Sequence, residues 1–318
     1  KYHWPAEFLA GLLNAQPMGF YSPNSLVQDA QRHGVIVLPP DVNESDYDCT
    51  VVPHPVDSDD TATYLGAGWR RGRGALEDPV RMATAVRLGL RYVRNLGDAE
   101  IARIEAARAV TGRFETVVEL AQRTGLPVGG LEGLAAAGAL ESLGVGRREG
   151  LWAAGALAGM GPGRLPLAAG ADPPRLFPMD ETEAARADLW STGISVRHPV
   201  EFVREWLESE GCLPIERVVA ERRQGRRLRV GGIVTHRQRP MTAKGVIFFN
   251  LEDETGILNV VVLPGVWEAN RETARRSVGV MIVGVLEYRD GVTNLVAQRI
   301  AGWPVEGIRS RNWAQGGR

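Results

Sequence analysis

The hydrophobic period of this chain changes from helical to strand-like at Leu228, and this change constrains the fold more than any other feature. Before it, apolar residues recur at helical spacing, as in PAEFLAGLLNAQ behind Pro5. After it come the strand-like segment LRVGGIVTH, a hairpin that turns at Asp253–Gly256, the helical segment GVWEANRETARR, and a hairpin that turns at Asp290–Gly291. The sequence therefore predicts helices first and a small β-barrel after them.

The order strand, strand, strand, helix, strand, strand is that of an OB-fold, a Greek-key barrel that binds oligonucleotides. Another small barrel or sheet is the alternative that this pattern leaves open. Arg237, Arg239 and Lys244 fall in the loop after the first strand, where OB-folds grip a single strand. Phe248 and Phe249 should point to opposite faces, one into the core. We assign the outer position to Phe248, which would stack on a base or pack on a neighbouring domain.

A second candidate site lies in LRYVRNLGDAEIARIEAAR, from Leu90 to Arg108. The stretch predicts two helices joined by a glycine turn, and such a hairpin offers backbone N–H groups and a helix N-terminus to a phosphate. Gly97 would permit close approach, and Asp98 would cap the second helix. An ordinary helical hairpin with solvated arginines is the alternative. The candidate DNA-binding residues here are Arg91, Arg94, Asn95, Gly97 and Arg103.

Charge is distributed unevenly along the chain. Residues 1–60 carry nine acidic and two basic residues, whereas residues 70–113 carry ten arginines and five acidic residues. A guanidinium pairs with phosphate through two parallel hydrogen bonds, so the second region suits nucleic acid better than the first. The arginine excess is weak support by itself, because lysine occurs only at Lys1 and Lys244 and the composition as a whole favours arginine.

Two acidic motifs are predicted to be solvated turns rather than metal sites. SDYDC places Asp46 and Asp48 on one face of an extended segment, which could hold divalent ions, but no third carboxylate stands at a suitable position. EDE, Glu252–Glu254, falls in a hairpin turn and receives the same interpretation. We therefore predict no metal site, no cofactor and no catalytic residue in this chain.

The cysteine content and the hydropathy pattern suggest a compartment. Cys49 and Cys212 are too few for a disulfide framework or a zinc cluster, and they suit a reducing compartment. No apolar run approaches the roughly 20 residues that a membrane span needs. We expect a cytoplasmic protein without a membrane partner. The first residue is Lys1 rather than Met, so we also expect a part of a longer protein.

Taken together, these segments resemble the C-terminal third of a bacterial C-family DNA polymerase, the polymerase III alpha-subunit family. The similarity covers nearly the whole chain in the family's order. The segments that carry it are HWPAEFLAGLLN, HGVIVLPPDVNESDYDCT, VRLGLRYVRNLGDAEIARIEAAR with LEGLAAAGALESLG, STGISVRHPVEFVREWL, and VGGIVTHRQRPMTAKGVIFFNLEDETGILNVVVLPGVWE.

The segment LLNAQPMGFYSPNSLVQDAQRHGV resembles the error-prone branch of that family, which acts in damage-induced translesion synthesis and DNA repair. Two departures from the family pattern matter. The family's hairpin reads glycine, apolar, glycine, but its first position here is Asn95, which tolerates left-handed backbone and should preserve the turn. The sliding-clamp peptide of the replicative enzymes has only degenerate counterparts in GRLPLAAG and PPRLFPM, so the resemblance implies an indirect clamp contact through mutasome-type accessory proteins.

The resemblance implies a multidomain α+β protein in which a helical fingers end and a helix-hairpin-helix region precede a C-terminal OB-fold. The expected domains are a fingers end at 1–60, a helix-hairpin-helix DNA-binding region at 61–154, a Gly/Pro-rich linker at 155–179, a helical connector at 180–225, the OB-fold at 226–303 and a tail at 304–318. The family's palm, with its Mg-binding aspartates, would lie upstream of Lys1, so this part alone should not polymerise.

Several functional hypotheses remain. The first is the DNA-binding C-terminal portion of an error-prone DNA polymerase, a nucleotidyltransferase, gripping primer-template duplex and single-stranded template. The alternatives are a fragment of a replicative polymerase III alpha subunit and a non-catalytic, stand-alone DNA-binding accessory protein. A further one is an anticodon-binding module of tRNA synthetase type, which should prefer RNA.

Overall fold

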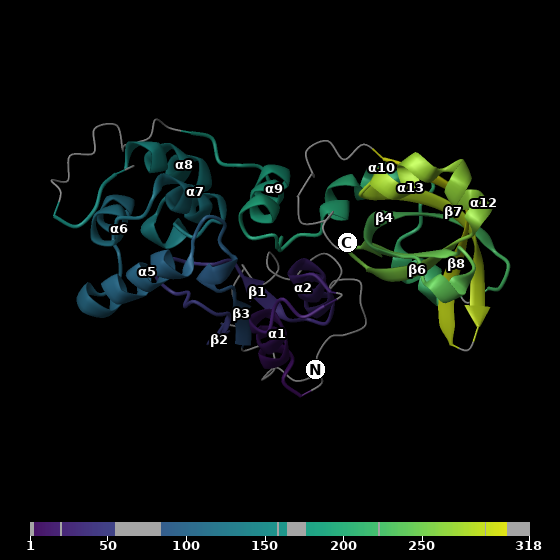
Figure 1. The fold of residues 1–318 in the computed structure, drawn as a ribbon, viewed down its shortest axis with the longest axis horizontal. Coiled ribbons are helices and arrows are strands. Elements are labelled where there is room, and N and C mark those ends of the chain that lie inside the picture. Colours follow the sequence, from purple (N-terminus) through teal and green to yellow (C-terminus); the bar gives the residue numbers. More distant parts are fainter. Residues whose placement is uncertain are drawn as a thin grey trace. The chain divides into compact units, whose positions relative to one another are not determined.

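The computed structural model describes residues 3–19, 21–54, 84–157, 159–163, 176–221, 223–289 and 291–303. The chain divides into two compact units, the first reaching Val196 and the second beginning at Arg197 (Figure 1). This division falls inside the connector expected at 180–225. Residues 57–74, which the polar, glycine-rich sequence predicts to be an exposed loop, lie outside the described residues. So do residues 164–175 of the linker, with most of the two clamp-like motifs, and the tail.

The first unit opens with two helices and a small sheet. Ser22 caps the second helix, where its hydroxyl accepts the backbone N–H of Ser25. The strand order is β1-β3-β2, with β1 and β3 parallel and β2 and β3 antiparallel. The two helices and the first strand agree with the sequence prediction, whereas β2 and β3 were not predicted. The elements are α1 (Pro5–Asn14), α2 (Pro23–Arg32), β1 (Ile36–Leu38), β2 (Thr50–Pro53) and β3 (Thr84–Arg87).

The first helix predicted for the hairpin does not form. Strand β3 ends at Arg87, before the stretch begins, and only a three-residue 3-10 turn, η2 (Leu90–Tyr92), precedes α5 (Asp98–Thr111). The reason is tertiary packing: Gly89 lies against the backbone of Tyr47 and Asp48, with no room there even for a Cβ. The apolar residues that suggested a helix, Leu90 and Val93, enter the core instead.

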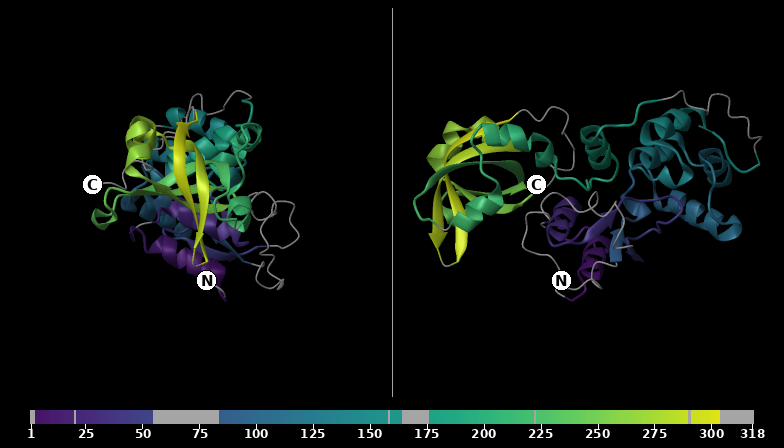
Figure 2. Two further views of the ribbon diagram at one scale, coloured as in Figure 1. Left: turned by 90° about the vertical axis from the view of Figure 1, so that its right-hand side faces the viewer. Right: turned by 180° about the vertical axis from the view of Figure 1, so that it is seen from behind.

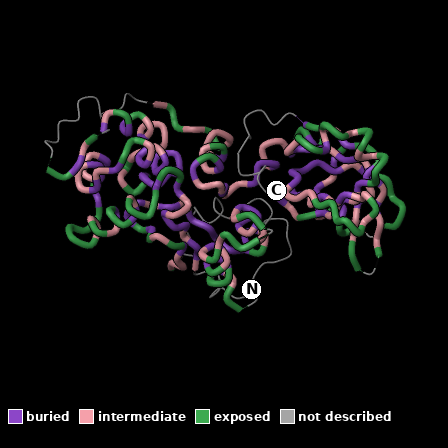
Figure 3. The backbone as a smooth tube through the Cα atoms, viewed as in Figure 1, coloured by how far each residue is buried: buried purple, intermediate pink, exposed green. Residues whose placement is uncertain are grey.

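Four further helices and a 3-10 turn complete the first unit. Leu120, Leu131, Leu134 and Leu140 are fully buried and form its larger core with Ile101 and Ile104 of α5 (Figure 3). Gly150 lets two of these helices approach closely, because a Cβ there would stand 2.9 Å from the Cβ of Ala135. The elements are α6 (Val117–Thr124), α7 (Val128–Ala136), η3 (Glu141–Leu143), α8 (Arg147–Ala156) and α9 (Glu181–Ser191).

The second unit is a closed five-stranded barrel of strand order β4-β5-β6-β8-β7, the barrel that the sequence predicted, and its β7–β8 hairpin extends beyond the barrel wall (Figure 2). Both hairpins turn where predicted. The glycine pair also bends the first strand: a Cβ on Gly232 would stand 2.7 Å from the Glu252 carbonyl oxygen. Its elements are η4 (Pro199–Val203), α10 (Arg204–Ser209), α11 (Ile215–Glu221), β4 (Arg227–Gln238), η5 (Met241–Ala243), β5 (Ile247–Asp253), β6 (Gly256–Val262), α12 (Pro264–Ala269), α13 (Arg271–Arg276), β7 (Gly279–Arg289) and β8 (Val292–Gly302).

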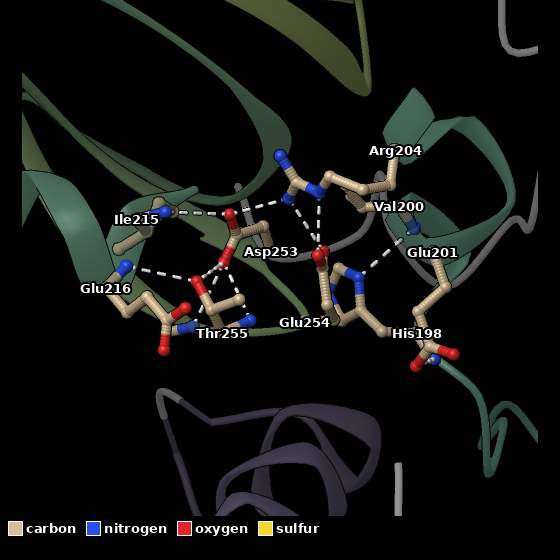
Figure 4. Close-up of polar contacts among 10 residues, drawn as sticks. His198, Val200, Glu201, Arg204, Ile215, Glu216, Asp253, Glu254 and Thr255 are labelled. Atoms are coloured by element: carbon tan, nitrogen blue, oxygen red, sulfur yellow. Dashed lines mark hydrogen bonds and ion pairs between the residues drawn. The ribbon is translucent and has the colours of Figure 1, made fainter. Parts of the chain in front are cut away.

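The prediction of a solvated turn at Glu252–Glu254 is also wrong, because all three side chains are at most 3% exposed. Arg204 of α10 donates to both Glu254 carboxylate oxygens at 2.6 and 2.7 Å and to Asp253 Oδ2 at 2.8 Å (Figure 4). Asp253 also accepts the backbone N–H of Ile215 at 2.9 Å. Burial and the neighbouring Glu254 raise the pKa of Asp253. The sequence of the turn alone could not predict its burial, because the arginine that pairs with its carboxylates lies far away in the chain.

We predict that Arg204→Leu destabilises the barrel unit by about 3 to 5 kcal/mol, because it leaves two buried carboxylates without their cation. The matched control is Arg276→Leu, since Arg276 and its partner Glu272 have side chains 79% and 83% exposed and such pairs contribute about 0 to 1 kcal/mol. Urea unfolding of each variant measures the difference. If both variants lose the same free energy of unfolding, the buried contacts of Arg204 with Asp253 and Glu254 do not stabilise the barrel.

Candidate nucleic-acid interface

The hairpin turn, residues 93–97, rests on a glycine-bearing face of α7. A Cβ on Gly133 would clash with the carbonyl oxygen of Arg94, and one on Gly130 would stand 3.3 Å from Leu96 Cδ1. Asn95 adopts a φ of 60°, so the left-handed backbone expected at this position is confirmed. The turn's sharp path therefore depends on two local conditions, a residue that tolerates positive φ and a helix without side chains beneath it.

The N-terminus of α5 carries its own acidic residues. Gly97, rather than Asp98 as predicted, is the N-cap, and its N–H donates to Glu100 Oε2 at 3.1 Å. Asp98 Oδ1 instead accepts the Tyr47 hydroxyl at 2.8 Å, a hydrogen bond that raises the Tyr47 pKa. A helix N-terminus is equivalent to about half a positive charge. Two carboxylates therefore outweigh it, and attraction for a phosphate must come from a neighbouring cation.

The three arginines predicted to flank the turn differ in what they already bind. Arg91 donates to Asp48 Oδ1 at 2.8 Å and to the carbonyl oxygens of Asn14 and Gln16 at 3.1 and 3.2 Å. Its guanidinium thus fixes the loop before β2 onto α1, and its pKa is raised mainly by the hydrogen bond to Asp48.

Arg103 is similarly engaged, since it donates to Glu100 Oε1 at 2.9 Å and to the Gly125 carbonyl oxygen at 3.0 Å. Arg94 is exposed, and within the described ranges its guanidinium makes a single contact, with the ring of Trp190 at 4.9 Å from the centroid. The sequence gave the three arginines equal weight. Of these three arginines, Arg94 is the one whose N–H groups have no acceptor among the described residues.

In the barrel, the three basic residues predicted to bind a single strand also differ in what they already bind. Arg237 donates to the carbonyl oxygens of Ala274 and Ser277, and burial lowers its pKa to about 10. Arg239 and Lys244 are exposed, and Lys244 has a φ of 48°. Lys244 and Arg239 remain available for a ligand, whereas Arg237 is committed to the barrel.

The two phenylalanines lie as expected. Phe249 is fully buried and contacts the edge of Trp267, and Phe248 points to the other face of β5 and is half-buried. Phe248 is the central member of an outward row that runs across three strands from Gln238 to Val261.

A second outward row was missed by sequence reasoning. His236, Asn250, Asn259 and Asn294 lie at paired positions on four neighbouring strands, and Asn259 Nδ2 donates to Asn294 Oδ1 at 2.6 Å. All four are half-buried. The signal that could have found them is the alternation of asparagine with apolar residues in IFFNLED and GILNVVV. Together with Phe248 they make a polar surface with one aromatic.

The two aspartates of the acidic motif SDYDC form ion pairs. Asp46 and Asp48 have side chains 65% and 51% exposed and pair with Arg108 and Arg91. The described part of the chain contains no cluster of three or more His, Cys, Asp or Glu side chains arranged to hold a metal ion. It also contains no helix that is long and apolar enough to cross a membrane.

Comparison with known proteins links both regions to nucleic-acid-binding families. A family described as a helix-hairpin-helix motif matches residues 34–150. A family described as an OB-fold nucleic acid binding domain matches residues 228–301. The predicted fold class, helical hairpin region followed by an OB-fold, is confirmed. Among solved structures, asparaginyl-tRNA synthetase from Pyrococcus horikoshii is similar over 32% of this chain and 26% of its own, with 19% identity and a TM-score of 0.25.

Curated relatives are similar along nearly the whole chain. The error-prone DNA polymerase of Mycobacterium tuberculosis is 43% identical over 316 residues, which are 98% of this chain and 26% of the relative. That of Nocardia farcinica is 43% identical, over 94% of this chain and 24% of the relative. That of Corynebacterium jeikeium is 41% identical, over 93% and 27%. The chain spans about a quarter of the length of these relatives, and it is homologous to that part of error-prone DNA polymerases.

Proposed function

We propose that this chain is the DNA-binding portion of an error-prone, damage-induced translesion DNA polymerase. The first unit would hold primer-template duplex at the hairpin turn, and the barrel would hold single-stranded template. The observation that carries the proposal is the uncommitted guanidinium of Arg94 beside a turn with exposed backbone. A guanidinium with free N–H groups suits a phosphate, which can accept two of them at once.

The duplex contact would use Arg94 directly, with Asn95 and Gly97 providing the exposed backbone of the turn. Arg91 and Arg103 would act by holding neighbouring segments in place, because their guanidinium groups already bind carboxylates and carbonyl oxygens. Of the three arginines predicted to contact the duplex, the proposal therefore keeps Arg94. The single-strand contact would use Arg239, Lys244 and Phe248. Arg237, which lies within β4 rather than in the loop after it as predicted, would hold that strand to the backbone of Ala274 and Ser277.

We propose that the parent is a DNA-directed DNA polymerase that uses Mg, that accessory proteins of a mutasome type recruit it and connect it indirectly to the sliding clamp, and that it acts in the cytoplasm. A stand-alone DNA-binding accessory is the alternative. Coding sequence for palm aspartates directly upstream of Lys1 would rule it out.

The duplex contact is tested by Arg94→Ala in the 318-residue chain. Each released phosphate contact contributes about −0.9 to the slope of log K against log salt. We therefore expect Arg94→Ala to weaken duplex binding and to reduce the steepness of that slope by about 0.9, the value for one phosphate contact. Fluorescence anisotropy titrations between low and moderate salt measure both quantities. Arg103→Ala is the control and should leave the slope unchanged. A slope lowered by the control and not by Arg94→Ala would contradict the assignment.

The single-strand contact is tested by the double variant Arg239→Ala with Lys244→Ala. It should reduce affinity for an oligodeoxythymidine and lower the salt slope by about 1.4, since single strands release about 0.7 counterion per contact. Arg237→Ala should instead lower the unfolding midpoint of the barrel, because it removes two contacts to backbone carbonyls. Tighter binding of RNA than of DNA of equal length would favour the anticodon-type hypothesis over this one.

A further inference from the structure

Helix α9 holds Arg94 on two sides, although the two lie almost a hundred residues apart. The backbone N–H of Arg94 donates to the Ser191 carbonyl oxygen at 2.6 Å. Its guanidinium carbon stands 4.9 Å from the centroid of the Trp190 ring, within the distance at which an arginine and an indole attract each other. The last turn of α9 thus contacts both the main chain and the side chain of this one hairpin residue.

Helix α9 is itself fixed to the rest of the first unit. Arg147 of α8 donates to Asp188 Oδ1 at 2.6 Å and to the Ala136 carbonyl oxygen at the end of α7. Arg148 donates to both carboxylate oxygens of Glu183 at 2.7 Å, and Asp180 caps the helix. Trp190 therefore stands on an anchored element rather than on a loop.

The contact with Trp190 leaves the guanidinium N–H groups of Arg94 available. The guanidinium carbon lies over the indole ring, and the attraction between a cation and the face of a ring uses no N–H hydrogen bond, so these groups can still form the two parallel bonds that a phosphate accepts. Trp190 is 44% exposed, more than a residue that serves only the core would be. The contact with the ring restricts the rotamers of a long side chain before the ligand arrives, which lowers the entropy lost on binding.

We propose that Trp190 is a positioning residue that orients Arg94 for a DNA phosphate. The proposal rests on the proposed duplex-binding function and adds a residue of α9 to that site. Trp190 acts through Arg94, so its effect on binding must vanish when Arg94 is absent.

The test is a double-mutant cycle on duplex binding by the 318-residue chain, with Arg94→Ala, Trp190→Ala and their combination. We expect Trp190→Ala to weaken binding about two- to fivefold, the range of an exposed cation–π contact, and to have no further effect in the Arg94→Ala background. Trp190→Phe, which keeps an aromatic face, should recover part of the loss. The matched control is Trp152→Ala on α8, whose side chain is 53% exposed and which should bind as the wild type does.

Circular dichroism and thermal unfolding of each variant separate positioning from folding. Non-additive losses with unchanged melting temperature support the proposal. Equal losses from Trp190→Ala with and without Arg94, or no loss at all while Arg94→Ala weakens binding, would overturn it and leave the duplex contact standing. If Arg94→Ala itself leaves binding unchanged, the proposed duplex contact is wrong and the positioning role falls with it.

Discussion

The packing of the hairpin turn on the bare face of α7 is the constraint on which the rest of the first unit depends. Gly133 leaves no room for any side chain next to the Arg94 carbonyl oxygen. With the turn seated there, Asn95 takes its left-handed conformation and α5 starts at a fixed place. Its buried residues Ile101 and Ile104 then reach the shared core. Gly130 and Gly133 of α7 thus serve one close approach of this helix to the turn.

Most arginines near this turn stabilise the fold. Arg123 donates to the carbonyl oxygens of Ala107 and Gly112 at the end of α5, where a cation also compensates the helix dipole. Arg108 reaches the Val42 carbonyl oxygen, and Arg147 joins three helices. Within the described residues 84–113, the number of arginines therefore overstates the charge available to a ligand. Arg94 is the arginine of this range whose N–H groups have no acceptor among the described residues.

The sequence predicted the barrel well because its signals are local. Strand alternation and the two hairpin turns each depend on neighbours within a few residues. The hairpin helix failed for the opposite reason, since Gly89 packs against the backbone of Tyr47 and Asp48, which lie far away in sequence. The buried turn at Glu252–Glu254 failed likewise, because its counter-ion Arg204 lies on another element. Among candidate site residues, the sequence located the turn and the loop, but which arginines were free depended on tertiary partners.

The most direct test of the central claim observes the arginine side chains themselves. Nitrogen-15 NMR of the 318-residue chain can follow the side-chain Nε–H signals of Arg91, Arg94 and Arg103 while a short DNA duplex is added, with each signal assigned by an Arg→Lys variant. The Arg94 signal should shift progressively with duplex, and those of Arg91 and Arg103, already bonded within the protein, should stay in place. A shift confined to Arg91 or Arg103, with Arg94 unmoved, would contradict the account.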